Sequence, residues 1–265
     1  MNYKKSYQPK KGYTKISEIG KCSLKMLEFG IIELDGGEKL DFETEDREVA
    51  FIMLEGYCNV IFGDVKWERV GNRTTVFENR KAESFYMPRD QKLTIEACDH
   101  IKIAVCGTPV EEKTEPQLLK EDHVVLKVLG EQPYQRETSF IIDQNSNAKV
   151  LTIGEAYVTP GNWAGFPPHK HDEDNMPKEC IAEEIYYFLF NPSQGFAVQC
   201  LYTSDGEIDE AYRVKQDELV EFPKGYHTTV SIPGYETYFL WLMAGEYQGF
   251  NRSNDPEHEW ILEQK

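Results

Sequence analysis

The chain has little basic charge. Of its 265 residues, 29 are Lys or Arg and 46 are Asp or Glu, so the formal net charge is −17. Nucleic acids and anionic membranes bind to basic surfaces, so this balance argues against both as general partners. It does not exclude an anionic small molecule, because a few positive side chains can invert the sign of the field at one site.

Long apolar runs and paired cysteine motifs are also missing. No stretch approaches the roughly 20 residues of a membrane-spanning helix. The basic start MNYKKSYQPKKGYTK lacks the apolar core of a secretion signal. The six cysteines are scattered without CxxC spacing, which is typical of free thiols in a reducing compartment. We therefore predict a cytoplasmic location.

The chain also lacks long amphipathic helical patterns. Instead, short segments rich in β-branched and aromatic residues follow one another, each bounded by Gly, Pro, Asp or Asn. Such regular strands predict an all-β fold built from sandwiches or barrels. The strands form two blocks, separated by a polar stretch that begins PVEEKTEPQLLKEDH. We predict one β-barrel domain at residues 1–110, a linker at 111–135 and a second barrel with a C-terminal tail at 136–265.

The second block contains a group of residues suited to metal binding. His169 and His171 stand two apart in FPPHKH, so on a strand their side chains share a face. Glu184 follows at the start of a further strand, and His227 enters another after the turn in FPKGYH. Three imidazoles and a carboxylate suit Zn, Mn, Fe, Ni or Co, with positions left open for water or substrate. We predict one divalent transition metal ion, Zn or Mn being favoured, on these four residues.

The order HxH, Glu and then PxG with His close behind resembles the two metal motifs of the cupin superfamily. The run GNWAGFPPHKHDEDNMPKECIAEEIYYFLFNPSQGF, with FPKGYH, YFLWLMAG and NDPEHEWIL, resembles a narrower family. This family is the 5-deoxy-glucuronate isomerases of inositol catabolism, related to the 4-deoxy-5-hexosulose-uronate ketol-isomerases. The resemblance is dense from about residue 150 to residue 261 and looser before it. It implies a bicupin with its metal site in the C-terminal barrel only, because the first barrel has no HxH.

Several features of the sequence bear on how far the family pattern transfers. Twelve residues, 172–183, separate HxH from Glu184, a lengthening that the isomerase family shares. The resemblance and the strand alternation both select Glu184 over its neighbour Glu183 as the ligand. The turn PKGYH has one residue fewer before its histidine than the usual cupin form. The segment MAGEYQGFNRSND, residues 243–255, departs from the family, so no substrate contact is carried over onto it.

The resemblance implies a metal-dependent aldose–ketose isomerase that converts 5-deoxy-glucuronate to 2-deoxy-5-keto-gluconate. It places Arg136, in PYQRETSF, where a guanidinium would clamp the substrate carboxylate with two parallel donors. Tyr186 shares the face of Glu184 and is the candidate for proton transfer. The implied partners are a small deoxy uronic acid and further copies of the chain, since many bicupins form homo-oligomers.

Two other functions are compatible with the sequence. One is the same chemistry on the pectin-derived 4-deoxy-5-hexosulose uronate. The other is a non-catalytic cupin that binds a sugar acid. Proton transfer through an enediol and a direct hydride shift both stay open, as do the roles of Glu183 and His258.

Overall fold

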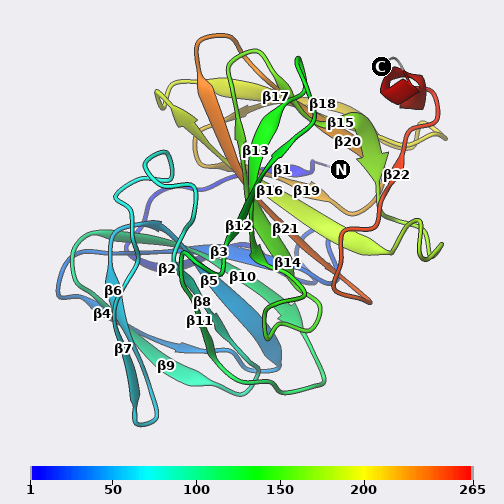
Figure 1. Cartoon of the computed structure of the whole chain (residues 1–265). Helices are drawn as coiled ribbons and strands as arrows, with labels where there is room; N and C mark the ends of the chain where they lie inside the picture. The colour runs from blue at the N-terminus through cyan, green and yellow to red at the C-terminus, as the bar shows by residue number, and fades with distance from the viewer. Residues whose placement is uncertain (1, 264–265) are drawn as a thin grey trace.

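The structure, a computed structural model, describes residues 2–263 and is built almost wholly from β-strands, as predicted. Figure 1 shows the N-terminal half, in blue and cyan, beside the C-terminal half, in green to red. The one helix among these residues is the short 3-10 helix η1 (Glu259–Glu263). No helix in the described part of the chain is long and apolar enough to cross a membrane.

The strands of the N-terminal half form two antiparallel sheets. The six-stranded sheet has the order β11 (Gln117–Leu119), β8 (Ser84–Met87), β5 (Arg47–Glu55), β10 (Ile101–Pro109), β3 (Glu28–Leu34) and β2 (Gly12–Ser17). The four-stranded sheet has the order β4 (Lys39–Glu43), β9 (Lys92–Ala97), β6 (Cys58–Phe62) and β7 (Val65–Val70).

The C-terminal half also forms two sheets. The seven-stranded sheet has the order β1 (Lys4–Ser6), β19 (Glu218–Phe222), β16 (Ala182–Asn191), β21 (Glu236–Gly245), β14 (Thr152–Val158), β13 (Arg136–Ile142) and β12 (Val125–Leu129). The five-stranded sheet has the order β18 (Asp209–Lys215), β17 (Phe196–Tyr202), β20 (Tyr226–Ser231), β15 (Trp163–Lys170) and β22 (Ser253–Asn254).

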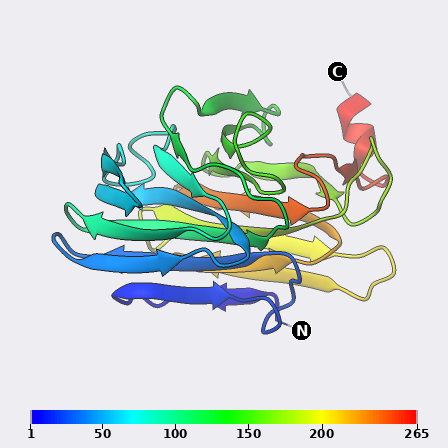
Figure 2. The ribbon, with the colours of Figure 1, turned by 90° about the horizontal axis from the view of Figure 1, so that it is seen from below.

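The four sheets enclose three apolar cores. One core lies between the four- and six-stranded sheets, and another lies between the seven- and five-stranded sheets. The third joins the six-stranded sheet to the seven-stranded sheet, and Figure 2 shows the strands of both halves stacked together. Central strands such as β3 and β16 are therefore buried on both faces. This explains the apolar run at residues 185–190 of β16, since a strand alternates polar and apolar residues only when one face meets water.

The strand order repeats between the halves, because β8-β5-β10-β3-β2 matches β19-β16-β21-β14-β13. A further strand is added at one edge of each of these five-strand groups. β1, at the N-terminus, pairs with β19 of the C-terminal half, and β11 pairs with β8. The predicted linker 111–135 thus contains two strands, β11 and β12, one on each side of the boundary.

Buried carboxylates tie the halves together. Glu48 on β5 accepts backbone N–H groups of residues 149–151, just before β14. Glu183 on β16 accepts those of residues 25 and 26, just before β3. These two contacts are reciprocal in the repeated strand order. Arg73 also reaches across, to the fully buried Glu155, which accepts further hydrogen bonds from two tyrosine hydroxyls. A buried ion pair of this kind is costly to break, because either partner alone leaves an uncompensated charge.

Candidate metal centre and adjoining pocket

Three strands of the C-terminal half bring a carboxylate and three imidazoles together. His169, at the end of β15, pairs with His227 on β20, and His171 follows directly after β15. Glu184 on β16 lies with its Oε2 atom 3.0 Å from Nε2 of His171 and 3.0 Å from Nε2 of His227. All four side chains are almost fully buried. Candidate ligand atoms of His171, Glu184 and His227 lie within 4.8 Å of one another.

The backbone fixes which nitrogen each histidine turns to the centre. Nδ1 of His171 lies 2.7 Å from the carbonyl oxygen of Ala182, and Nδ1 of His227 lies 3.2 Å from that of Gly225. A carbonyl oxygen only accepts, so each Nδ1 must carry the proton. The neutral ring then presents the lone pair of Nε2 to Glu184. A hydrogen bond from the other ring nitrogen to a backbone carbonyl is the usual way in which proteins orient metal-binding histidines.

This arrangement needs a positive charge at its centre. Two neutral rings would turn Nε2 lone pairs toward the carboxylate of Glu184, which is repulsive unless a proton on His171 or a metal cation lies between them. Glu184 Oε1 and His227 Nε2 are buried, and neither has a hydrogen-bond partner among residues 2–263. Buried polar atoms without partners are rare and call for an explanation such as an ion. The donor set and these two atoms fit a divalent transition metal.

The pKa shifts favour the metal-binding forms of His169, His227 and Glu184, but not of His171. Burial lowers the pKa of His227, and Glu184 offsets this only in part. Burial, together with the charge of Arg252, lowers the pKa of His169 well below its usual value. Burial would raise the pKa of Glu184, but its contacts with His171 and His227 outweigh it and lower that pKa. For His171, burial is outweighed by Glu184, so its pKa is raised. The centre therefore holds an ionised carboxylate beside at least two neutral imidazoles.

The long connection between HxH and Glu184 is organised by the lysine between the two histidines. Lys170 points away from the centre and donates to Glu179 at 3.0 Å and to Asp172 at 2.6 Å. Glu179 also accepts the backbone N–H groups of residues 172 and 173. These bonds return the chain so that β16 begins beside His171.

His169 lies next to the group of three rather than inside it. Its ring centroid is 4.4 Å from that of His227, and its Nδ1 lies 3.2 Å from the carbonyl oxygen of Gly165. Gly165 has φ +64°, and a Cβ atom there would come within 2.9 Å of the His169 ring, so glycine makes room for it. Nε2 of His169 accepts a hydrogen bond from Arg252 at 3.2 Å.

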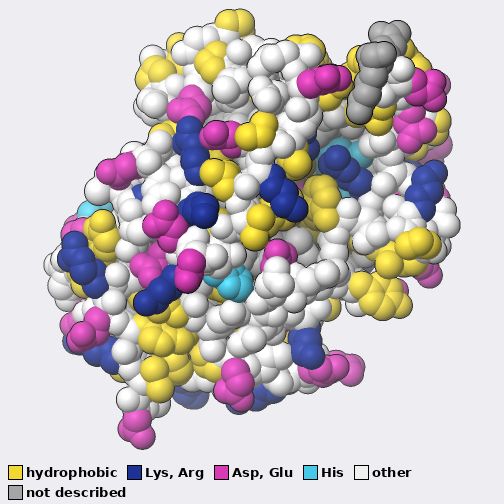
Figure 3. All heavy atoms as spheres, viewed as in Figure 1, with side chains coloured by type: hydrophobic (Ala, Val, Ile, Leu, Met, Phe, Trp, Pro, Cys, Tyr) yellow, Lys and Arg dark blue, Asp and Glu magenta, His cyan; other side chains and the backbone are white. Residues whose placement is uncertain are grey.

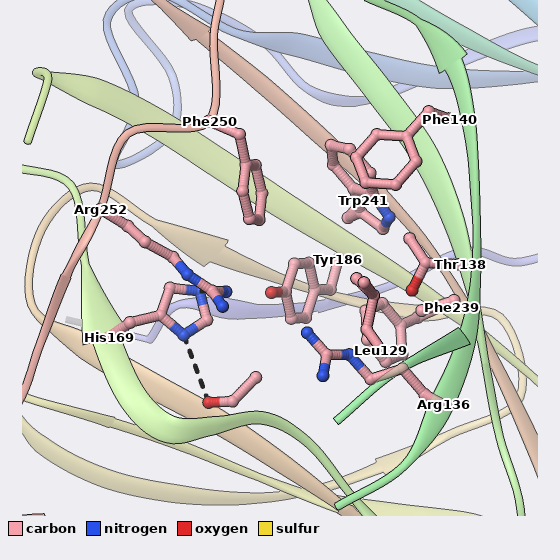
Figure 4. Close-up of a pocket in the computed structure, with 12 residues that line it drawn as sticks. Leu129, Arg136, Thr138, Phe140, His169, Tyr186, Phe239, Trp241, Phe250 and Arg252 are labelled. Atoms are coloured by element: carbon pink, nitrogen blue, oxygen red, sulfur yellow. Dashed lines mark hydrogen bonds between the residues drawn. The ribbon is translucent and has the colours of Figure 1, made fainter. Parts of the chain in front are cut away.

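A pocket opens on the other side of His169 (Figure 4). Arg136 and Arg252 reach into it from opposite sides, and the ring of Tyr186 lies between them. Its apolar walls include Trp241 and Phe250. In the space-filling view, basic and histidine side chains lie together in a hollow of this half of the molecule (Figure 3).

The surroundings of the pocket shift the pKa values of Arg136 and Tyr186. Burial, then the charge of Arg252, lowers the pKa of Arg136 to about 10, so this side chain stays charged at neutral pH. Burial, then the charge of Glu184, raises the pKa of Tyr186 well above its usual value. The Tyr186 hydroxyl therefore keeps its proton and can act as a donor.

Arg252 was missed by the sequence analysis. It lies in the segment 243–255, onto which no substrate contact was carried over. One signal was available: between residue 246 and residue 264, Arg252 is the one Lys or Arg. Glu183 faces away from the metal-binding candidates and holds the N-terminal half. His258, half-buried beside η1, does not line the pocket.

The fold and the His/Glu group together define an all-β, cupin-like protein. Oxalate decarboxylase from Lactobacillus farciminis, in a structure described as a formate complex, covers 100% of this chain with a TM-score of 0.68 at 11% identity, which speaks for the fold alone. The family model described as KduI/IolB family matches residues 3–261. This chain belongs to the KduI/IolB family, and the resemblance inferred from the sequence is confirmed.

Relatives match nearly the whole chain. The 5-deoxy-glucuronate isomerase of Geobacillus kaustophilus is 37% identical over 89% of this chain and 86% of its own length. The protein of that name from Bacillus subtilis strain 168 is 33% identical over 97% of this chain and 96% of its own length. The crystal structure of an IolB-like protein from Salmonella typhimurium LT2 superposes with a TM-score of 0.94 at 30% identity, covering 99% of this chain and 100% of that one.

Proposed function

We propose that this protein is a metal-dependent aldose–ketose isomerase that converts 5-deoxy-glucuronate to 2-deoxy-5-keto-gluconate. The names of relatives at 33–37% identity over most of the chain support the reaction. The observation that carries the metal dependence is the buried group of His171, Glu184 and His227 beside a pocket with two arginines.

The proposal assigns the metal to His169, His171, Glu184 and His227. His169 joins as the fourth ligand once its Nε2 is released by Arg252. A divalent ion, with Zn or Mn favoured, supplies Lewis acidity that polarises a carbonyl oxygen. The two β-halves then form a bicupin whose metal site lies in the C-terminal half.

The remaining chemistry belongs to residues of the pocket. Arg136 binds the carboxylate at the far end of the substrate, where a guanidinium offers two parallel N–H donors. The Tyr186 hydroxyl, protonated at neutral pH, donates a proton or a hydrogen bond to the substrate oxygen that gains charge. The apolar walls exclude water, which strengthens both contacts.

The proposal includes a homo-oligomer and a cytoplasmic location, as predicted from the sequence. A second candidate substrate, 4-deoxy-5-hexosulose uronate, follows from the family name, which joins KduI with IolB. The relatives that match this chain carry the name of the first substrate, which favours it.

Incubation of the protein as purified with each deoxy uronic acid, followed by NMR, tests this function. We expect 5-deoxy-glucuronate to be converted to the ketose faster than the hexosulose uronate. A chelator should abolish the conversion, and added metal should restore it. Elemental analysis should find close to one divalent transition metal per chain. A fully loaded protein that turns over neither acid would instead favour a sugar-acid-binding cupin.

A further inference from the structure

The pocket beside the metal-binding candidates contains two arginine side chains that form no ion pair with the described residues. Arg136 is only 9% exposed, yet its guanidinium has no hydrogen-bond partner among the described residues. Arg252 reaches the same pocket, and none of the residues that line it is acidic. The charge of Glu184 acts on Arg252, but no carboxylate of the described residues forms an ion pair with either guanidinium.

Burying two like charges side by side is unfavourable unless an anion accompanies them. Other buried arginines pair with carboxylates: Arg47 pairs with Glu28, and Arg73 pairs with Glu155. Among residues 2–263, the one side-chain hydrogen-bond partner of Arg252 is the uncharged Nε2 of His169, at 3.2 Å. This partner is weak for a guanidinium, because it offers a single lone pair and no charge.

We propose that Arg252 and Arg136 together form the site for the substrate carboxylate, with Arg252 leaving His169 when the acid binds. The inference rests on the proposed function and extends it, because it adds the second half of the anion site. It also assigns Arg252 two alternating partners: His169 in the empty pocket and the carboxylate in the filled one.

The shape of the pocket favours such a movement. Its enclosed part, about 30 Å³, has room for a water molecule, and the rest of its free space is open to solvent, so a six-carbon acid is enclosed only if a wall shifts. Most of its walls stand on β-strands, whereas Arg252 and Phe250 come from the irregular segment 246–252. This segment is therefore the wall that shifts, and its shift carries Arg252 away from His169.

The test measures binding rather than turnover. D-gluconate is an open-chain acid without a carbonyl group, so the proposed reaction cannot consume it, and D-glucitol is its neutral counterpart. Calorimetric titration of the protein as purified should show a preference for gluconate. Arg252→Gln and Arg136→Gln should each weaken gluconate binding about 10- to 100-fold, the usual loss for one charge-assisted contact, and leave glucitol binding unchanged.

Two further variants control for other causes. Arg252→Lys keeps the charge without the two-pronged geometry and should give an intermediate loss, even if the Gln variant folds poorly. Arg69→Gln removes an exposed arginine of the N-terminal half and should change nothing.

The outcomes separate this inference from the proposed function. Unchanged gluconate affinity in Arg252→Gln, or no preference for gluconate in the unmodified protein, would overturn the two-arginine site even if the isomerase assay succeeds. A gluconate preference that depends on Arg252, in a protein that isomerises neither uronic acid, would leave the anion site standing and remove the isomerase.

Discussion

The two halves of the molecule place very different side chains at matching points of one strand pattern. In the C-terminal half, His169 on β15 pairs with His227 on β20. At the matching points of the N-terminal half, Phe42 on β4 pairs with Leu93 on β9. Both pairs are buried between the two sheets of their own half. The same ladder therefore holds either imidazoles or apolar side chains.

The comparison extends to β5 and β16. Glu48 of β5 and Glu183 of β16 occupy equivalent positions, since each ties its half to the other. From this alignment, Val49 is equivalent to Glu184, and Phe51 is equivalent to Tyr186. The ring centroids of Phe51 and Phe85 lie 4.5 Å apart in a stacked pair, within the apolar core of the N-terminal half. A few side chains thus decide whether this scaffold forms a packed core or a site. The connection before the strand is also longer in the C-terminal half, which gives His171 its backbone partner.

Removing one half is the most drastic way to break this comparison. A fragment of residues 110–265 would expose the apolar core between the six- and seven-stranded sheets and lose β1 from the edge of β19. We expect it to aggregate or stay unfolded and to have no isomerase activity. Size-exclusion chromatography, circular dichroism and the NMR assay check this against the full chain. A monodisperse, active fragment would show that the first half is dispensable.

Replacing one ligand by its apolar counterpart is the next strongest test. His227→Leu copies Leu93 and should keep the fold, because a leucine suits a buried strand position. It removes a nitrogen from the centre, so metal content should fall far below one per chain. Turnover should fall more than about 100-fold, beyond the usual effect of losing an outer contact to a metal ligand. Elemental analysis and steady-state kinetics measure both.

The reverse change is the matched control. Leu93→His places an imidazole among apolar side chains without a carboxylate beside it, so it should add no second metal. It should cost about 1–3 kcal/mol of unfolding free energy, the usual penalty for a buried polar group without a partner. A second equivalent of metal in this variant would contradict our account of the N-terminal half.

Tyr186→Phe removes the hydroxyl and gives this position the same residue type as Phe51 in the N-terminal half. If the hydroxyl donates to the reacting oxygen, kcat should fall about 100-fold, the lower range for losing a general acid, while metal content stays constant. KM should change little, because the ring and its packing remain. An unchanged kcat would mean that Tyr186 lines the pocket but takes no part in the reaction. Phe51→Tyr in the other half should leave kcat as it was.

Strand alternation agreed with the family resemblance in selecting Glu184 over Glu183. Glu184 lies beside His171 and His227, whereas Glu183 bonds to the N-terminal half. The opposite facing of these two neighbours depends on the two-residue period of a strand, which is a local property of the sequence. His171 lies just beyond β15, so the shared face of the two histidines stays a prediction. The all-β class followed in the same way from short, regularly spaced apolar segments.

Other features depend on contacts between distant segments and left no comparable signal. β1 and β11 have three residues each, too few for a pattern, and each is fixed by its partner strand. Glu48 looks like an ordinary polar residue at the start of a strand, since its donors are backbone groups about a hundred residues away. Arg252 reaches the pocket from an irregular segment, whose path the sequence does not specify.

The smallest expected effects come from changing Glu48 and Glu183, the two glutamates at equivalent positions of the halves. Glu48→Gln and Glu183→Gln should each lower the unfolding free energy by about 1–3 kcal/mol, because the amide loses one acceptor and turns N–H groups toward backbone donors. Neither should change metal content, since both side chains face the opposite half. Denaturant titrations and elemental analysis measure the two effects separately.

Glu184→Gln, one residue beyond Glu183, should differ from it in metal content. A neutral amide is a poorer ligand than a carboxylate, so this variant should lose metal. It also loses the charge-assisted contact between Glu184 and His171, so metal content rather than stability separates the two variants. If Glu183→Gln were the variant that lost metal, the facing of β16 would be shifted by one residue, and the proton-transfer candidate would become Tyr187.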